Sequence, residues 1–86
     1  METRVAVISI IVENGEMVEK INDLLHENAK YIIGRMGIPY RKREIALISV
    51  AIDAPQDAIS SLSGKLGKLA GVTLKTAYSS VGVNAE

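Results

Sequence analysis

The sequence predicts an α+β fold in which four strands and two helices follow one another in the order βαββαβ. Residues 3–12 and 44–53 are nearly unbroken runs of Val, Ile and Ala, which is typical of strands covered on both faces. Residues 16–28 and 55–71 repeat apolar side chains at helical spacing, which indicates two amphipathic helices. At 86 residues, the chain has room for one such domain.

The first half of the chain shows clear boundaries between its elements. The first strand (3–12) ends before Asn14, which is placed to cap the helix over residues 16–28. Acidic residues in the first turn of that helix favour the positive end of its dipole. The next strand, residues 31–40, contains Pro39 and two glycines, which is typical of a strand at the edge of a sheet.

The second half is predicted in the same way. The second helix starts at Pro55, because proline lacks an amide that the first helical position does not need, and it stops at Gly71. The last strand covers residues 72–79, so residues 1–80 form one domain and residues 81–86 a flexible tail. Two βαβ units with right-handed crossovers close as a ferredoxin-like sandwich, an antiparallel four-stranded sheet with both helices on one face. We expect the two most apolar strands, the first and third, in its centre.

The composition argues against several classes of function. The 10 lysines and arginines balance the 10 aspartates and glutamates, so the chain lacks the basic excess of a nucleic-acid binder. It has no cysteine, and its one histidine, His26, is expected to be solvated, so we predict no metal site and no cofactor. No constellation of catalytic residues stands out, so we do not expect an enzyme. Without a membrane-length apolar run or a cleavable signal, the protein is expected in the cytoplasm.

The sheet face that carries no helix is predicted to be apolar. If Tyr40 pairs with Glu44, Met36 and Ile38 point towards the helices and the alternate residues lie on the open face. Covering about 400 Å² of that face is worth on the order of 10 kcal/mol before association costs, which favours a homodimer or a higher oligomer. The alternative is that the true strand register differs by one residue from the assumed one. In that case these apolar residues form the core and not an exposed patch. The predicted interface residues are Val5, Val7, Ser9, Ile11, Ile33, Ile45, Leu47 and Ser49.

Two places are candidates for ligand contact. Arg35 is the one charge that this register places on the open face, where a buried guanidinium would need an anionic ligand or a partner's acceptor. The alternative is that Arg35 extends from the edge strand into solvent. The junction Glu13-Asn14-Gly15 offers free amides at a helix N-terminus for a small anionic or zwitterionic ligand, or it is simply a capped turn.

The turn Arg41-Lys42-Arg43 is a cluster of positive charge without an acidic residue between its members. Such a cluster can meet the phosphate or carboxylate groups of a partner. The alternative is a solvated hairpin whose charges discourage pairing between sheet edges.

A stripe of small residues runs along the second helix: Ser60, Gly64, Gly67 and Gly71. Glycine inside a helix costs about 1 kcal/mol relative to alanine, so we expect something to pack closely against this stripe. Either the first helix or a partner segment would explain it.

The segments 34–41 (GRMGIPYR), 48–50 (ISV) and 64–72 (GKLGKLAGV) resemble a family of short proteins described as iron-only hydrogenase system regulators. The resemblance covers nearly the whole chain. It implies a fold similar to ACT domains, regulatory modules that bind amino acids or other small effectors, and to the C-terminal domain of nickel-responsive repressors. ACT domains commonly carry an Asp-x-Pro-Gly-like turn after the first strand, of which this chain keeps only an acidic start and a glycine. Nickel-responsive repressors use several histidines and a cysteine, which disfavours nickel sensing here.

The apolar open face predicts an oligomer, and the resemblance implies an ACT-like regulatory module linked to the hydrogenase system. Its expected partner is a second copy of the chain. A small polar or amino-acid-like effector, or a protein partner, would bind between the subunits. The alternative is a structural or adaptor protein that acts by protein–protein contact without a ligand. A DNA-associated regulator is disfavoured by the neutral charge, and neither nucleic acid nor a membrane is an expected partner.

Overall fold

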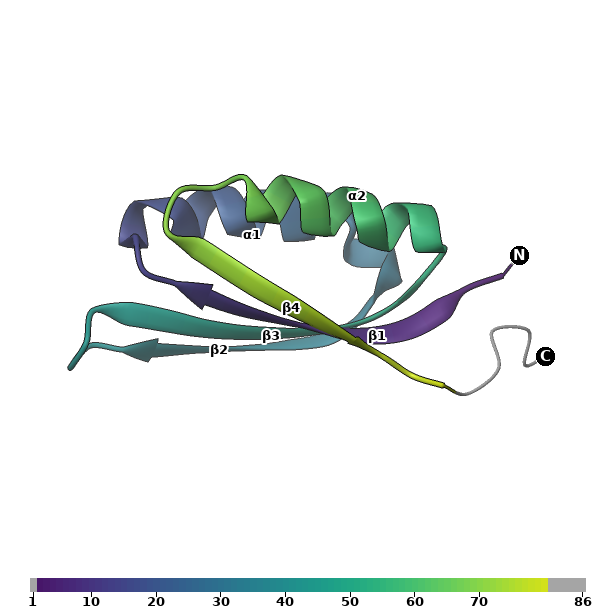
Figure 1. Cartoon of the computed structure of the whole chain (residues 1–86), viewed down its shortest axis with the longest axis horizontal. Helices are drawn as coiled ribbons and strands as arrows, with labels where there is room; N and C mark the ends of the chain where they lie inside the picture. Colours follow the sequence, from purple (N-terminus) through teal and green to yellow (C-terminus); the bar gives the residue numbers. More distant parts are fainter. Residues whose placement is uncertain (1, 81–86) are drawn as a thin grey trace.

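The computed structural model describes residues 2–80 as one antiparallel sheet covered by two helices (Figure 1). The strands are β1 (Arg4–Val12), β2 (Ile32–Tyr40), β3 (Ile45–Ala54) and β4 (Val72–Tyr78), and their order across the sheet is β2-β3-β1-β4. The ferredoxin-like α+β sandwich is thus confirmed, with the first and third strands in the centre. The predicted tail, residues 81–86, lies outside the described residues.

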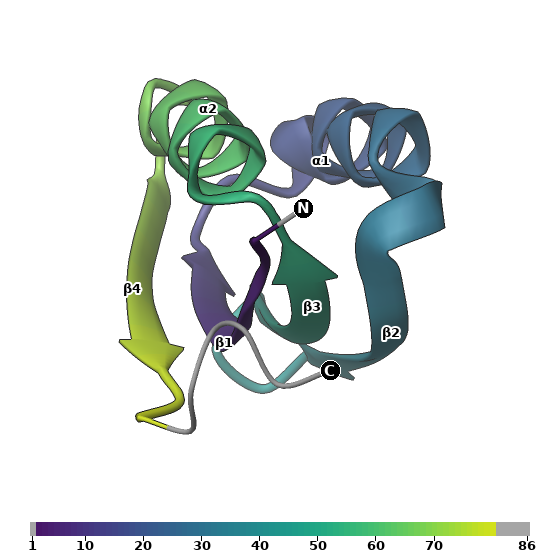
Figure 2. The same ribbon diagram turned by 90° about the vertical axis from the view of Figure 1, so that its right-hand side faces the viewer.

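Helices α1 (Val18–Glu27) and α2 (Gln56–Gly67) lie side by side on one face of the sheet (Figure 2). Short 3-10 turns, η1 (Gly15–Met17) and η2 (Ala29–Tyr31), flank α1. The predicted cap is present, because Asn14 Oδ1 accepts a hydrogen bond from the Glu16 amide at 3.1 Å. Among residues 2–80, neither helix combines the length and apolar character needed to cross a membrane.

The end of α2 differs from the prediction. The helix stops at Gly67, and two tight turns, in which Leu69 donates to Leu66 O and Val72 donates to Leu69 O, lead the chain into β4. Gly71 lies in the second of these turns with a φ of 74°, a conformation that glycine adopts without steric cost. The glycine therefore shapes the entry into β4 and does not end the helix.

The core lies between the helices and the covered face of β1 and β3. Every second residue of these two strands points towards the helices, as the period of a strand requires. Within the part of the chain that the structure describes, no polar or charged residue is buried. The core residues are Ala6, Ile8, Ile10 and Val12 of β1, Ile48, Val50, Ile52 and Ala54 of β3, Ile21 and Leu25 of α1, and Ile59, Leu62 and Leu66 of α2.

The hairpin between β2 and β3 has a register one residue away from the predicted one. Tyr40 lies opposite Ile45, whereas we expected it opposite Glu44. The reason is the loop, which comprises residues 41–44 and not 41–43. Its last residue, Glu44, adopts a φ of 57°, which is uncommon outside glycine, and donates its amide to Arg41 O at 3.2 Å.

This shift exchanges the two faces of β2. Met36 and Ile38, predicted to point towards the helices, lie on the open face and are 57% and 46% exposed. Arg35, predicted on the open face, points to the helix side, opposite the buried Val50. Ile33, predicted on the open face, lies in an irregularity of the strand between Ile32 and Gly34 and is 64% exposed, and Gly34 takes the place opposite Ala51.

The stripe of small residues on α2 does not pack against α1. A Cβ atom on Gly64 or Gly67 would have no heavy atom within 4 Å, so the explanation by a close approach of α1 is wrong at both positions, whereas a partner segment stays a prediction. The buried side of α2 is formed by Ile59, Leu62 and Leu66, and the small residues lie to one side of it, facing outwards.

Candidate functional site

The open face of the sheet carries a broad patch of exposed apolar side chains. The prediction that β1 and β3 expose Val5, Val7, Ile11 and Leu47 there is confirmed, and β2 adds three side chains that the wrong register had hidden. Each member is between 38% and 57% exposed. This open-face patch consists of Val5, Val7, Ile11, Met36, Ile38, Tyr40 and Leu47.

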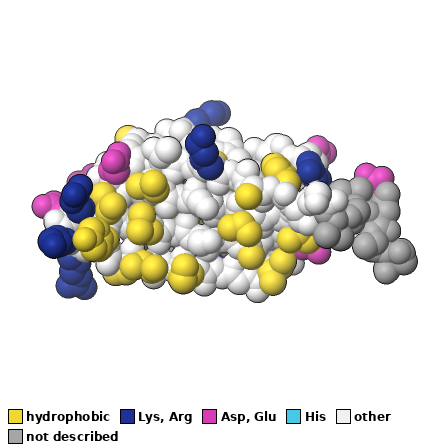
Figure 3. All heavy atoms as spheres, turned by 60° about the horizontal axis from the view of Figure 1, so that its bottom comes forward, with side chains coloured by type: hydrophobic (Ala, Val, Ile, Leu, Met, Phe, Trp, Pro, Cys, Tyr) yellow, Lys and Arg dark blue, Asp and Glu magenta, His cyan; other side chains and the backbone are white. Residues whose placement is uncertain are grey.

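A polar row crosses the middle of the open-face patch. Ser9 lies opposite Ser49 on one side and opposite Lys75 on the other, so three polar residues of β3, β1 and β4 line up across the sheet. Figure 3 shows this face, with the apolar side chains gathered in two groups and uncoloured surface between them. A partner that covered the face would therefore have to match two apolar areas and a polar row, which favours one register of docking over others.

The patch is hollowed between β1 and β2. A cavity of about 240 Å³ has Leu47 and Ser49 of β3 at its floor, with Ile11 of β1 on one side and Met36 and Ile38 of β2 on the other. Of the other predicted interface residues, Ser9 also lines this cavity, Ile45 is partly buried at the start of β3, and Ile33 lies outside the patch. The hollow has the dimensions to receive a large apolar side chain from a partner.

Arg35 lies in a pocket between β2 and α1. Its Nη2 donates a hydrogen bond to Asn22 Oδ1 at 2.6 Å, and the pocket has a volume of about 470 Å³. Within residues 2–80 no carboxylate pairs with this guanidinium, and its other donors have no protein acceptor. Arginine presents five N–H donors in a planar fork that suits carboxylate and phosphate groups. The pocket is lined by Asn22, Asp23, Leu25, His26, Ala29, Ile32 and Arg35.

Sequence reasoning nominated Arg35 but missed the residues around it. Asn22 and His26 are four residues apart on α1, so they lie on one face of that helix. The spacing of Asn22 and His26 could be read from the sequence. The β2–β3 register, which brings Arg35 to the same side of the sheet as α1, could not. No group of three or more carboxylate, imidazole or thiol side chains that could hold a metal ion occurs among residues 2–80.

The other predicted ligand site, the junction at 13–15, is occupied by the chain itself. The Glu13 amide donates to Gly71 O at 2.7 Å, and Gly71 packs against Asn14 so closely that a Cβ atom would lie 2.8 Å from Asn14 Cβ. Asn14 uses its side chain to cap η1, as described above, and Gly15 begins that turn. The junction is a capped turn in this structure, and it does not share a pocket with Arg35.

The basic turn stands at the tip of the β2–β3 hairpin. Arg41, Lys42 and Arg43 are all exposed, and none of them forms an ion pair within residues 2–80. In Figure 3 a cluster of lysine and arginine side chains borders one end of the apolar face. The turn therefore adds a positively charged rim to the open-face patch, next to Tyr40.

Comparisons with known proteins give the fold relatives of different closeness. The structure of the uncharacterized protein TM1266 from Thermotoga maritima is 35% identical, with a TM-score of 0.85 over 90% of this chain and 98% of that chain. A nitrogen regulatory PII-like protein, CPII from Thiomonas intermedia K12, bound to ADP, AMP and bicarbonate, is 16% identical, with a TM-score of 0.60 over 92% of this chain and 99% of that chain.

A formyltetrahydrofolate deformylase from Pseudomonas putida KT2440 shares 13% identity, with a TM-score of 0.64 over 85% of this chain but 28% of the deformylase chain. These two distant likenesses show the fold alone. No curated protein matches the chain. Residues 4–76 match the family model described as "Iron-only hydrogenase system regulator, putative", and the chain therefore belongs to this TM1266-like family.

Proposed function

We propose that this protein is a regulator of the iron-only hydrogenase system that works as a homo-oligomer, its subunits covering one another's open-face patch. The observation that carries the proposal is the patch itself. Monomeric proteins rarely expose large apolar patches, and such patches usually mark an interface. Here two apolar groups lie on either side of the Ser9–Ser49 row. The family description supports the regulatory part of the proposal.

The shape of the patch supports a second copy of this chain as its cover. The hollow over Leu47 suits a large apolar side chain, and the same face supplies such side chains from Ile11 and Ile38. A self-complementary face of this kind is what a twofold symmetric interface requires. Helices α1 and α2 cover the other face of the sheet, so covering the open face would give both sides of β1 and β3 an apolar environment.

A small anionic effector is best accommodated in the Arg35 pocket. Arg35 and Met36 are neighbours on β2 and point to opposite faces, so the pocket and the patch share one edge strand. An effector can regulate only if it binds two states with different affinity. Under the proposal, an anion held by Arg35 changes the position of β2, and Met36 carries that change into the contact between subunits.

Self-association is tested by size-exclusion chromatography with light scattering at micromolar concentration. The wild type is expected to elute above the monomer mass, and Leu47→Glu is expected to elute as a folded monomer, because a carboxylate in the hollow cannot be covered without a large desolvation cost. Ser61→Glu, at an exposed position on α2, is the matched control and should assemble like the wild type. A monomeric wild type would contradict the proposal.

The effector is tested separately with a thermal-shift panel of amino acids and small carboxylates. A ligand that binds the pocket should raise the melting temperature of the wild type and of Arg43→Gln, because Arg43 lies on the distant hairpin tip. The shift should vanish in Arg35→Gln, which keeps a polar side chain but is shorter and has lost the charged guanidinium. A flat panel would argue against the effector while leaving self-association standing.

A further inference from the structure

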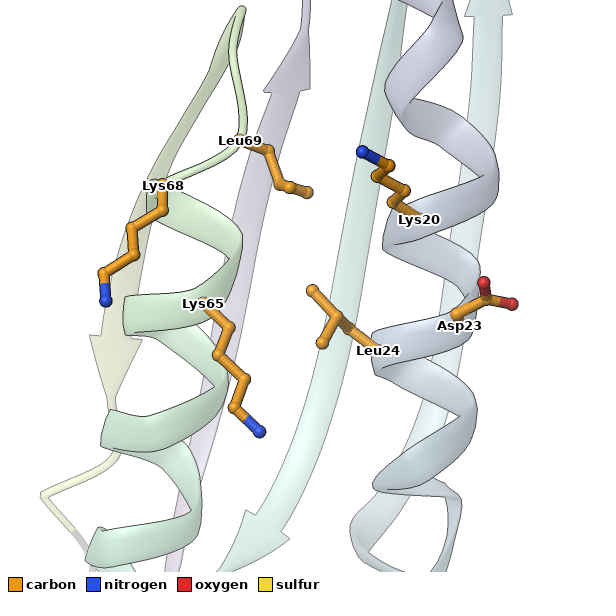
Figure 4. A pocket seen from close by; sticks show the side chains of 6 residues that line it. All are labelled: Lys20, Asp23, Leu24, Lys65, Lys68 and Leu69. Atoms are coloured by element: carbon orange, nitrogen blue, oxygen red, sulfur yellow. The ribbon is translucent and has the colours of Figure 1, made fainter.

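A second surface feature lies on the helix layer, away from the open-face patch. A groove of about 370 Å³ runs between α1 and α2, lined by Lys20, Asp23, Leu24, Lys65, Lys68 and Leu69. Figure 4 shows that Leu24 and Leu69 point into the groove, and that Lys20 and Lys65 extend from opposite sides towards opposite ends of it. Asp23 and Lys68 point away from it. The groove thus has an apolar floor and an ammonium group on each side.

The two lysines have no counter-ion within the described chain. Neither Lys20 nor Lys65 forms an ion pair or a hydrogen bond with its side chain among residues 2–80. A negative group near either ammonium would supply the counter-ion that the described residues do not. Lys20 also lies in the first turn of α1, where the helix dipole disfavours a cation by about 0.3–1 kcal/mol.

We propose that this groove docks an acidic amphipathic segment of a partner protein. An apolar side chain of the segment would lie between Leu24 and Leu69, and carboxylates on either side of it would meet Lys20 and Lys65. Inorganic anions and nucleic-acid phosphates would pair with the lysines but would leave the leucine floor uncovered. A groove between two helices, open along its length, suits a peptide that lays its apolar residue inwards.

The groove remains accessible when the sheet face is covered, because the helices and the open face lie on opposite sides of the molecule (Figure 2). Docking and self-association are therefore independent, and either can fail without the other. If the chain does assemble, each oligomer presents several such grooves, and a partner with repeated acidic segments gains affinity from binding more than one.

The experiment selects short random peptides from a display library on the immobilised wild-type protein. We expect the recovered peptides to share an apolar residue flanked by aspartate or glutamate. A labelled peptide from this set should bind more weakly to the double variant Lys20→Glu, Lys65→Glu by about tenfold or more, measured by fluorescence anisotropy. Added salt should weaken binding as well, because the paired charges are exposed.

Lys68→Glu is the control, because it makes one of the same Lys→Glu changes at the border of the groove, on a side chain that points outwards. It should weaken binding by less than about threefold, the range expected of an exposed charge that makes no direct contact. The double variant Lys20→Gln, Lys65→Gln removes charge without reversing it, and circular dichroism checks that both double variants fold. Peptides without acidic residues, binding that survives Lys20→Glu with Lys65→Glu, failure to enrich any peptide, or displacement of the peptide by a single-stranded oligonucleotide would each overturn the proposal.

Discussion

The two faces of the central strands carry the same kinds of side chain and have different surroundings. On β1, Ile10 is 1% exposed under the helices, whereas its neighbour Ile11 is 44% exposed on the open face. Both are isoleucines in the same strand, paired with aliphatic residues of β3. The difference comes from the topology, because both crossover helices lie on one side of the sheet.

This comparison shows what an apolar strand does and does not reveal. A run of aliphatic residues on both faces predicts that both faces avoid water, but it does not say which element of the chain covers each one. Here α1 and α2 cover one face, and the polar row through Ser9 and Ser49 distinguishes the other from a second core. A partner that covered this face would have to match the polar row, which would favour one register of docking over others.

The largest expected effect separates the two faces directly. Ile10→Ala should lower the free energy of unfolding by about 3 kcal/mol, because it leaves a cavity in a closely packed core. Ile11→Ala should cost less than about 1 kcal/mol in the monomer, because much of that side chain is already in water. Urea denaturation of both variants at low protein concentration makes the comparison.

The same pair also tests what covers the open face. If the cost of Ile11→Ala grows with protein concentration, a second copy of the chain buries Ile11 in the assembly, as we propose. The cost of Ile10→Ala should show no such dependence. If Ile10→Ala and Ile11→Ala lowered the free energy of unfolding equally at every protein concentration, the distinction between the two faces would be contradicted.

The second prediction concerns the end of the covered face, where the α2–β4 turn meets the β1–α1 junction. Gly71→Ala should lower the free energy of unfolding by about 2 kcal/mol, because alanine is strained at a φ of 74° and its Cβ would press on Asn14. Thermal denaturation measures the loss. Gly37→Ala is the control, since a Cβ atom there would meet nothing within 4 Å. A neutral Gly71→Ala would show that this turn does not hold the junction.

Much of the fold could be predicted from the sequence because its signals are repeated many times. Aliphatic runs identify β1 and β3, and the helical spacing of Ile59, Leu62 and Leu66 identifies the buried side of α2. The same helical geometry places Gly67 roughly a third of a turn, and Gly64 nearly half a turn, away from that side. Their outward position could therefore be predicted from the sequence, and it argues against packing on α1, one of the two explanations that the sequence left open.

The register of β2 could not be obtained in this way. Both sets of alternating residues in this strand mix apolar side chains with glycine, so the pattern does not select a face. The deciding feature is the length of the loop. This length depends on the positive φ of Glu44, which the residue types of the loop do not predict. The Arg35 pocket depends on that register. The wrong register therefore placed Arg35 on the wrong face of the sheet, although the predicted fold was right.

A smaller effect is expected on the outer surface of α2. Gly64→Ala should raise the free energy of unfolding by up to about 1 kcal/mol, because alanine is the better helix former and its methyl group meets no neighbour. Thermal denaturation at low concentration measures the gain. A loss of stability that appears only in the assembled protein would instead show that a second copy approaches this side of α2.

The smallest effect is expected at Ile38, and it discriminates most sharply between the two registers of β2. In this structure Ile38 lies on the open face opposite Leu47, so Ile38→Lys should change the free energy of unfolding of the monomer by no more than about 0.5 kcal/mol. In the register first expected from the sequence, the same lysine would point towards the helices. The unpaired buried charge would then lower the free energy of unfolding by several kcal/mol. Urea denaturation at low concentration distinguishes these values, and Ile52→Lys, on the covered face, gives the size of the buried penalty. Because the substitution leaves the monomer intact, any loss of assembly in the same sample reports on the open-face patch alone.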